Sequence, residues 1–457
     1  MGIGDNRTAA AKISDRRAAA GASDPTASAF FWLSAFFVVY CARPEDWIPG
    51  LNLIPCAKIT AVLAMWGLFT SWGRTKRTLK DVPLEGKLLL GIIGLLFCAG
   101  IFSPIWKGGA INKTIDFSKV FIAWVLAFLL ITSFERLRRI MYIQASCVAI
   151  ICAVSIIKGH NQPRLEGVIG GIYSNPNDLA FAVVLTLPLA LAFLITSKSM
   201  FNKALWVLAM LIMMAALFLT ASRAGFLNLI ISSTVTLYHF GIKGKRPSLI
   251  IGVILAAVLL GAVAGGKLYD RFQALGGDST TDESAYGSYE DRMYLMGRAV
   301  DGIENYPIFG LGARNFQTYS LVWREVHMTY LQVAVEGGVP CLILYLMFIG
   351  CGFKNLRILQ ATKGLDEHTV LFVGALHSSL IGFVVGAVFA PEGYQFFPYF
   401  AIAFTAALRA IVREREQEPS PASLPGPKKG RHFLEAYADY DYARPGAARP
   451  GTVSPVR

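Results

Sequence analysis

The sequence has 457 residues, of which 54% are hydrophobic and only 16% are charged, and its formal net charge is +13 at pH 7. Soluble proteins carry about 25% charged residues, so this composition excludes an ordinary cytosolic enzyme and favours a protein that crosses a bilayer many times. In a soluble chain the positive charge would suggest nucleic-acid binding. In a membrane protein it reports topology instead, so we expect a lipid bilayer and no nucleic acid as partners.

Twelve apolar segments come close to the about 17–25 residues that a helix needs to cross ~30 Å of hydrocarbon. They are residues 26–42, 56–73, 87–105, 116–133, 139–158, 179–197, 203–220, 224–241, 248–266, 328–352, 369–390 and 396–412. The sequence therefore predicts an all-α fold, a polytopic membrane protein with about 12 transmembrane helices. The polar segment ahead of the first helix contains no small-residue cleavage site, which favours a retained helix over a signal peptide.

Lysine and arginine residues gather in alternate loops. If the N-terminus lies inside, 29 of the 43 fall in the two terminal segments and the inner loops, as in 74–80 and 243–246. This positive-inside pattern predicts that both termini are cytoplasmic. The seven cysteines lie in or beside apolar stretches, so we expect no disulfide framework.

Two further polar segments complete the predicted domain organisation. Residues 1–25 are expected to form a cytoplasmic N-terminal segment, and residues 26–412 a transmembrane domain with one long outward loop at 267–326. Residues 413–457 are rich in proline, glycine and charge without apolar periodicity, which predicts a disordered cytoplasmic tail.

Two polar motifs lie at predicted outer helix ends. At Asn175-Pro176-Asn177-Asp178, Asn177 or Asp178 either caps the following helix or helps its N-terminus to receive an anionic group, with Arg164 upstream to assist. In the turn at 220–225 (Thr-Ala-Ser-Arg-Ala-Gly), Arg223 either snorkels to lipid head groups or forks onto a specific phosphate.

The long loop contains two more motifs. Arg292 and Arg298 begin a predicted amphipathic helix, which the Pro-Ile-Phe-Gly-Leu-Gly run at 307–312 ends with a turn. No strand precedes these glycines and no Lys-Ser/Thr follows them, which excludes a nucleotide-binding loop. A solvated helix face is the alternative interpretation of the two arginines.

His327 opens the tenth predicted span, at the outer membrane surface. Histidine suits proton transfer near neutral pH, although a histidine at a helix start also serves as an interfacial hydrogen-bonding group. His377, in the middle of the eleventh span, is either a bond between helices or a second candidate. No outward group of Asp, Glu and His has the spacing of metal ligands, so no metal site is predicted.

Taken in order, Asn-Pro-Asn, Ser-Arg-Ala-Gly, Arg292, the 305–316 run and His327 followed by Glu-Gly-Gly resemble the O-antigen ligase family. That superfamily also holds O-antigen polymerases and protein O-oligosaccharyltransferases, and the resemblance covers about residues 164–345. Residues 40–51 resemble its exosortase-associated putative O-glycosylation ligase branch. The family histidine is usually followed by Asn, whereas Met328 stands here.

The resemblance implies a GT-C-like membrane glycosyltransferase of the bacterial inner membrane, without a cofactor or metal. It would take a glycan from undecaprenyl diphosphate in the outer leaflet and transfer it, with inversion, to lipid A core, a protein or another glycan on the periplasmic face. His327 would be the catalytic base. Arg223 and Arg292, with Arg164, Asn177 and Arg298, would bind the diphosphate.

Two other interpretations stay open at the level of sequence. A polymerase of the same superfamily would differ only in its acceptor. A transporter or flippase of lipid-linked sugars would need charged residues along a path through the membrane, where Glu336 and His377 are the main ones.

Overall fold

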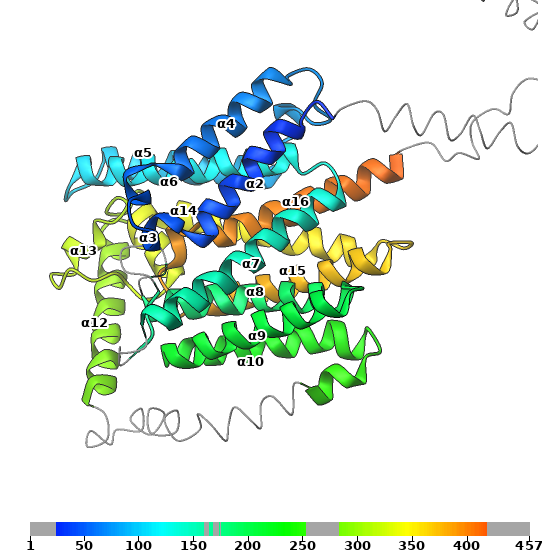
Figure 1. The fold of residues 1–457 in the computed structure, drawn as a ribbon. Coiled ribbons are helices and arrows are strands. Elements are labelled where there is room, and N and C mark those ends of the chain that lie inside the picture. Colours follow the sequence, from blue (N-terminus) through cyan, green and yellow to red (C-terminus); the bar gives the residue numbers. More distant parts are fainter. Residues whose placement is uncertain (1–23, 160–163, 168–172, 174, 253–282, 418–457) are drawn as a thin grey trace, which may run out of the picture. The chain divides into compact units, whose positions relative to one another are not determined.

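The computed structural model describes residues 24–159, 164–167, 173, 175–252 and 283–417 (Figure 1). The predictions for residues 1–23, for most of the ninth span, for the first part of the long loop and for the tail beyond 417 lie outside these ranges. The chain separates into two compact units, Met1–Val412 and Arg413–Arg457, and the first contains the twelve predicted apolar segments.

Every regular element of the described residues is helical, which confirms the predicted all-α class. The long helices are α2 (Ala27–Ala42), α4 (Cys56–Thr70), α5 (Leu84–Ile101), α6 (Lys107–Leu130), α7 (Phe134–Lys158), α8 (Pro176–Thr196), α9 (Met200–Thr220), α10 (Arg223–Leu237), α12 (Glu283–Asn305), α14 (Thr329–Ala361), α15 (Glu367–Gly386) and α16 (Phe396–Gln417). The short ones are α3 (Pro44–Trp47), α13 (Phe316–Tyr319), η1 (Leu51–Leu53), η2 (Leu79–Asp81), η3 (Tyr238–Ile242) and η5 (Glu392–Tyr394).

Eight helices of the described residues are long and apolar enough to cross a membrane, so the chain is a polytopic membrane protein. They are α5, α7, α8, α9, α10 with η3, α14, α15 and α16. Helices α2 and α4 are apolar but shorter, and α6 coincides with the fourth predicted span. Eleven of the twelve predicted apolar segments thus coincide with helices, and the ninth lies mostly outside the described residues.

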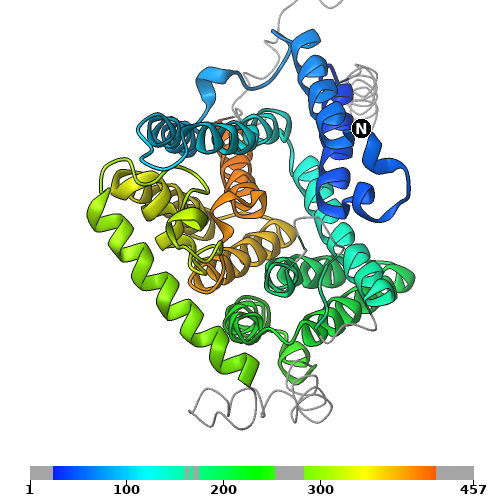
Figure 2. The same ribbon diagram turned by 90° about the vertical axis from the view of Figure 1, so that its left-hand side faces the viewer.

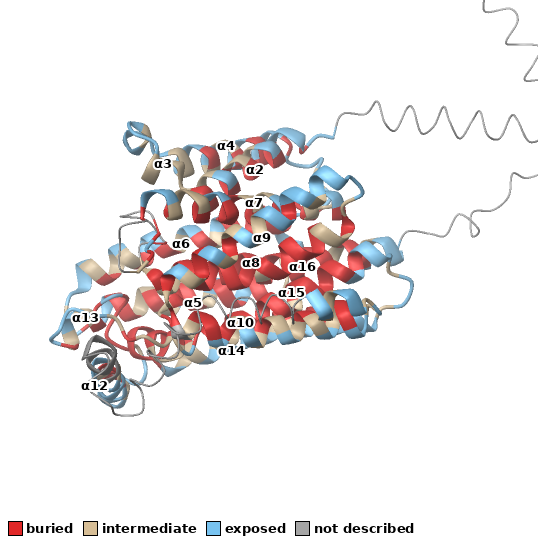
Figure 3. Cartoon of the chain, turned by 60° about the horizontal axis from the view of Figure 1, so that its bottom comes forward, coloured by how far each residue is buried: buried red, intermediate tan, exposed pale blue. Residues whose placement is uncertain are grey.

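The helices differ in how much of their apolar surface faces other helices. In α8, 89% of the most apolar stretch is buried, because α7, α9, α10 and α15 all pack against this helix. In α9 only 28% of the corresponding stretch is buried (Figure 3). Leu208 and Leu211 of α9 are exposed on its outer side. Exposed leucines on a spanning helix are compatible with lipid, which is as apolar as leucine, so α8 is central and α9 peripheral.

Helix α12 lies across one end of the bundle formed by the spanning helices (Figures 1 and 2). It is the predicted amphipathic helix of the long loop, although it begins at Glu283 rather than near Arg292. It ends at Asn305 because Pro307 has no N–H and disfavours helical geometry in the residue before it. Leu295 and Ala299 on its inner face join a small core with Leu311, Phe316, Val326 and Val335.

Helix α14 is interrupted, which corrects the prediction of one continuous span over 328–352. Gly338 has φ +83° and ψ 166°, far from helical values. Pro340 cannot donate to the carbonyl of Glu336, so that carbonyl is free to accept another partner. The turn at 310–312 supplies it: Gly312 N donates to Glu336 O at 2.9 Å and Leu311 N to Val335 O at 2.8 Å.

The opened turn and the loop fit closely because both contain glycine. In return for these bonds, Val339 N donates to Pro307 O at 2.8 Å. A Cβ on Gly338 would stand 2.1 Å from Ile308 O, and one on Gly310 would stand 2.7 Å from Gly338 N. The sequence signal for this break, a Gly-Gly pair two residues ahead of a proline, was missed in the prediction.

Replacing Gly338 by alanine is expected to destabilise the protein by about 2–5 kcal/mol, from left-handed backbone strain and from the overlap with Ile308 O. The readout is the thermal unfolding of the detergent-purified protein. Gly350→Ala is the matched control, since it lies in the same helix with open space around its Cβ position. Equal melting temperatures for the two variants would show that the interrupted helix is not required for stability.

Candidate functional site

The N-termini of α8 and α10 meet side by side. Asn175 caps α8 by accepting from Asn177 N at 2.9 Å, so the prediction that Asn177 or Asp178 is the cap was wrong. Pro176 occupies the first helical position, so the cap is the residue directly before it, Asn175. The side chain of Asn177 instead accepts a hydrogen bond of 2.7 Å from Ser222 Oγ, the cap of α10.

The turn that carries Arg223 is thereby fixed to α8. Ser222 Oγ also accepts from Gly225 N at 3.0 Å, and a Cβ on Gly225 would stand 2.7 Å from that of Ala180. Arg223 is the first residue of α10. Arg164 lies next to this turn, where its Nε donates to Thr220 O, the last residue of α9, at 3.1 Å. The structure therefore brings Arg164, Asn177 and the backbone of Arg223 together, while their predicted role in binding a diphosphate stays a prediction.

His327 is held at the N-terminus of α14. Thr329 N donates to Ala387 O at 2.8 Å, and its hydroxyl donates to Ala390 O at 2.6 Å while accepting from Glu392 N at 2.9 Å. These bonds join the start of α14 to the connection between α15 and α16. Two residues before Thr329, the imidazole Nδ1 of His327 is buried and has no hydrogen-bond partner among the described residues.

The surroundings keep the His327 ring neutral. Burial and the nearby charges of Arg292 and Arg324 lower its pKa to about 4. Arg324 forms an ion pair with Asp291, which lies beside Arg292 on α12. At neutral pH the ring therefore has an unprotonated nitrogen that can accept a proton.

The two predicted arginines of α12 have different surroundings. The charge of Arg292 helps to lower the pKa of His327. Arg298 follows six residues later, about 120° round the helix, and so lies on a different face of α12. Arg298 donates to Tyr319 O at 3.0 Å, its guanidinium lies 4.5 Å from the Tyr319 ring centroid, and it pairs with Asp301 at 3.3 Å. Its described contacts attach α13 to α12, so it positions the loop.

Three carboxyl groups lie close to one another here: Asp178, which the sequence analysis named only as a possible cap or anion-site residue, and Glu325 and Glu392, which it did not select. Glu392 of η5 is 4% exposed, and its Oε1 has no hydrogen-bond partner among the described residues. Burial raises its pKa well above the usual range, and the charges of Asp178 and Glu325 raise it further. Asp178 follows Asn177 at the start of α8, so Glu392 lies within electrostatic reach of α8 while its N–H donates to Thr329 at the start of α14.

Glu325 lies two residues before His327, within electrostatic reach both of the acidic Glu392 and of the basic Lys113 and Arg314. Its Oε1 accepts from Gln317 Nε2 at 2.9 Å. Burial raises its pKa, while the charges of Lys113 and Arg314 lower it. The polar Pro-Glu-Gly run at 391–393, directly after an apolar segment, was the available sequence signal for Glu392. The proximity of Glu392 to Asp178 depends on tertiary contacts, which the sequence signal does not give.

The two ionisable groups predicted within the membrane are both hydrogen-bonded. Glu336, at the break in α14, accepts from the hydroxyl of Tyr394 at 2.5 Å and is 1% exposed. His377 bonds to His239 at 2.8 Å, in line with the predicted bond between helices. Among the described residues, no group of three His, Cys, Asp or Glu side chains is arranged to hold a metal ion.

Comparison with known protein families supports the resemblance inferred from the motifs. Residues 208–346 match the family model described as O-antigen ligase, which confirms that resemblance; the matched range includes Arg223, Arg292, Arg298 and His327. No curated protein matches the chain. One chain from a solved peptidoglycan synthase complex matches at 17% identity with a TM-score of 0.40, covering 73% of this chain and 97% of its own.

The bond between Asn177 and Ser222 is expected to couple the two helix starts by about 1 kcal/mol, a typical net value for a buried hydrogen bond. A double-mutant cycle on thermal stability with Asn177→Ala and Ser222→Ala measures this coupling. Thr234→Ala serves as a comparison, because the Thr234 hydroxyl bonds only within its own helix, to Ile230 O. Strictly additive effects of Asn177→Ala and Ser222→Ala would refute the coupling.

Proposed function

We propose that this member of the O-antigen ligase superfamily is a glycosyltransferase that moves a glycan from undecaprenyl diphosphate to an acceptor hydroxyl, on lipid A core or a protein. The reaction would take place at the periplasmic face of the bacterial inner membrane, with both termini cytoplasmic. The observation that carries the proposal is that His327, with a buried Nδ1 atom and a lowered pKa, lies near the cations of Arg292 and Arg324.

The cations suit a diphosphate. Guanidinium groups bind phosphate oxygens with paired, charge-assisted hydrogen bonds, and their effect is greatest where water is excluded. We assign Arg223 and Arg292, assisted by Arg164, to the diphosphate. Asn177 positions the turn that carries Arg223, and Arg298 positions the loop.

The proposed reaction has one proton transfer and one displacement. The acceptor oxygen attacks the anomeric carbon on the side opposite the diphosphate, the bond from that carbon to the diphosphate oxygen breaks, and undecaprenyl diphosphate leaves with the electron pair. His327 accepts the hydroxyl proton and later releases it to water. Diphosphate leaves without a general acid, and attack from the opposite side inverts the anomeric centre.

A carboxyl group repels a diphosphate whenever it is ionised, so we place the three acidic side chains toward the sugar or the acceptor. Carboxylate oxygens accept hydrogen bonds from hydroxyl groups. A Glu392 kept protonated by its raised pKa can also donate one. We assign Asp178, Glu325 and Glu392 to orienting hydroxyl groups around His327.

Transfer is better supported than transport of a lipid-linked sugar. A transport path needs accessible polar side chains through the membrane, whereas Glu336 is buried against Tyr394 and His377 is bonded to His239. A polymerase would use the same site with a growing glycan as acceptor. Mass spectrometry of the product, made with a labelled lipid-linked glycan, distinguishes the acceptors and shows whether any covalent product forms.

His327→Gln should reduce the rate of glycan transfer by about 10²–10⁴, the usual contribution of a general base, because glutamine cannot take up the hydroxyl proton. The measurement is the appearance of glycosylated acceptor in membranes that contain equal amounts of inserted protein. His368→Gln is the matched control, since His368 is exposed at the opposite end of α15. Full activity of His327→Gln would remove the proposed base.

The pH dependence of transfer should follow the protonation of His327. With a pKa of about 4, the ring stays neutral at and above neutral pH, so the rate should fall only under acidic conditions. Arg324→Gln removes a cation that disfavours the imidazolium, so its pKa should rise and the acid limb of kcat/KM should move to higher pH. Lys363→Gln, an exposed charge at the opposite end of the bundle, should leave the profile in place. An unmoved limb in Arg324→Gln would contradict the assignment.

A further inference from the structure

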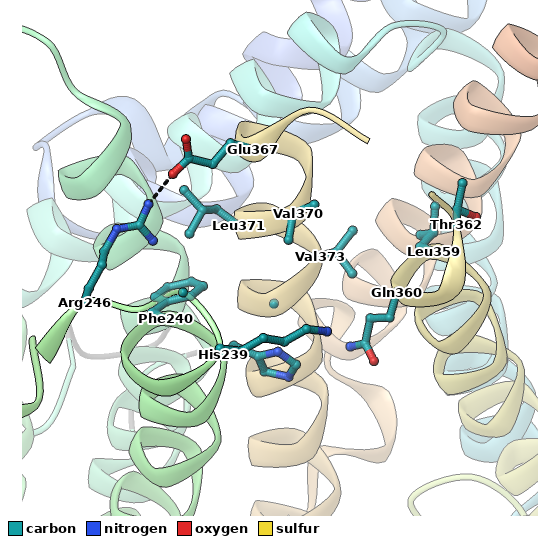
Figure 4. A pocket seen from close by; sticks show the side chains of 13 residues that line it. His239, Phe240, Arg246, Leu359, Gln360, Thr362, Glu367, Val370, Leu371 and Val373 are labelled. Carbon is teal, nitrogen blue, oxygen red and sulfur yellow. Dashed lines mark hydrogen bonds and ion pairs between the residues drawn. The ribbon is translucent and has the colours of Figure 1, made fainter. Parts of the chain in front are cut away.

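A second polar site lies at the opposite end of α10, α14 and α15 from His327. There η3, the end of α14 and the start of α15 enclose a cavity of about 300 Å³ whose lining includes His239, Lys243, Arg246 and Gln360 (Figure 4). Because α15 starts at this cavity and ends near Thr329, its 20 residues separate the two sites by about 30 Å. The cavity is therefore distinct from the site around His327.

A second cavity of about 420 Å³ shares Gln360 with the first, and Lys354, Arg357 and His377 contribute to its lining. The hydrogen bond of 2.8 Å between His239 Nε2 and His377 Nδ1 connects the two. Figure 4 shows His239 and Gln360 projecting from different helices into the same space. A pair of histidines and a glutamine thus give this space a polar floor between otherwise apolar helices.

The charge of the two cavities is strongly unbalanced. Four lining residues are basic, namely Lys243, Arg246, Lys354 and Arg357, and among the lining residues only Glu367 is acidic. Glu367 is already paired with Arg246 at 2.5 Å. Three cations from two different segments therefore face a concave polar surface without an acidic partner among the residues that line it.

We propose that these two neighbouring cavities, which share Gln360, bind the phosphate group of an anionic ligand. Lysine and arginine are the side chains that hold phosphate oxygens, and the imidazole and amide groups of the floor add further hydrogen-bond donors. A basic pocket between the ends of spanning helices lies at the depth of lipid head groups, as in sites for anionic lipids. The phosphate belongs either to such a lipid or to a soluble phosphate compound.

The test measures binding to the full-length protein purified in a neutral detergent. Dissociation constants are determined for phosphatidylglycerol and phosphatidylcholine by native mass spectrometry, and for inorganic phosphate by calorimetry. The variant Lys243→Gln/Arg357→Gln removes one cation from each cavity. We expect its affinity for the bound probe to fall about fivefold per removed charge, a cation near a lipid phosphate contributing about 1 kcal/mol.

The matched control is Lys245→Gln/Lys363→Gln, which removes two charges from the same end of the bundle at residues that do not line the cavities. Phosphatidylglycerol binding that depends on Lys243 and Arg357 supports a lipid ligand, and phosphate binding with that dependence supports a soluble one. Equal losses in variant and control, or no binding of either anionic probe, would overturn the proposal. Because each outcome is a binding constant, it is independent of whether glycan transfer occurs.

Discussion

The exchange of main-chain hydrogen bonds between the 307–312 turn and the opened part of α14 is the constraint on which the end of the bundle that carries α12 and His327 depends. Pro340 removes one donor of the helix, and Gly338 turns the chain away from helical geometry. The bonds that α14 thereby loses are replaced by bonds to Pro307, Leu311 and Gly312. An unpaired backbone group in a membrane environment is costly, so the helix break and the loop stabilise each other.

Because the turn is fixed in this way, the rest of the long loop has a defined place. Asn315 is buried and its amide donates to Ser103 Oγ at 2.8 Å and to Leu311 O at 2.9 Å, which ties the loop to the connection between α5 and α6. Helix α12 packs its apolar face on the same small core as Leu311 and Val335. Arg292 and His327 come within electrostatic reach of each other as a result.

The resulting site has separate regions of charge. Arg292 and Arg324 lie by the imidazole of His327, and the carboxylates of Asp178, Glu325 and Glu392 adjoin the same segment. Such a separation suits a reaction in which one partner leaves as a polyanion and the other enters as a neutral hydroxyl. Burial is greatest on the acidic side, where Glu392 is 4% exposed, whereas Arg324 on the basic side is exposed.

Some cations of the predicted inner loops have structural roles at helix ends. Arg77 is 2% exposed and donates to Phe128 O at 2.8 Å and Ile131 O at 2.9 Å, at the C-terminus of α6. A cation placed there binds carbonyls that no helical N–H reaches. Arg409 has a different role, since it lies within α16 and donates to the side-chain Oδ1 of Asn355 within α14 at 2.8 Å. The same positive charge that predicts topology from sequence thus also completes helix termini.

The sequence by itself determined most of the helices and the resemblance to the O-antigen ligase family. Apolar runs of spanning length locate α5, α7 and α14, because a chain that crosses a membrane has few alternatives to a helix. The short polar motifs around Arg223 and His327 are also visible in the sequence, because each is a local run of residues. The tertiary structure decided which of these motifs share a site. The interruption at Gly338 and the grouping of Asp178, Glu325 and Glu392 depend on contacts between residues far apart in the chain. The Gly-Gly pair ahead of Pro340 signals that the helix breaks, but no local pattern shows which loop bonds to the break or which carboxyl groups meet, because those contacts form only when the helices pack.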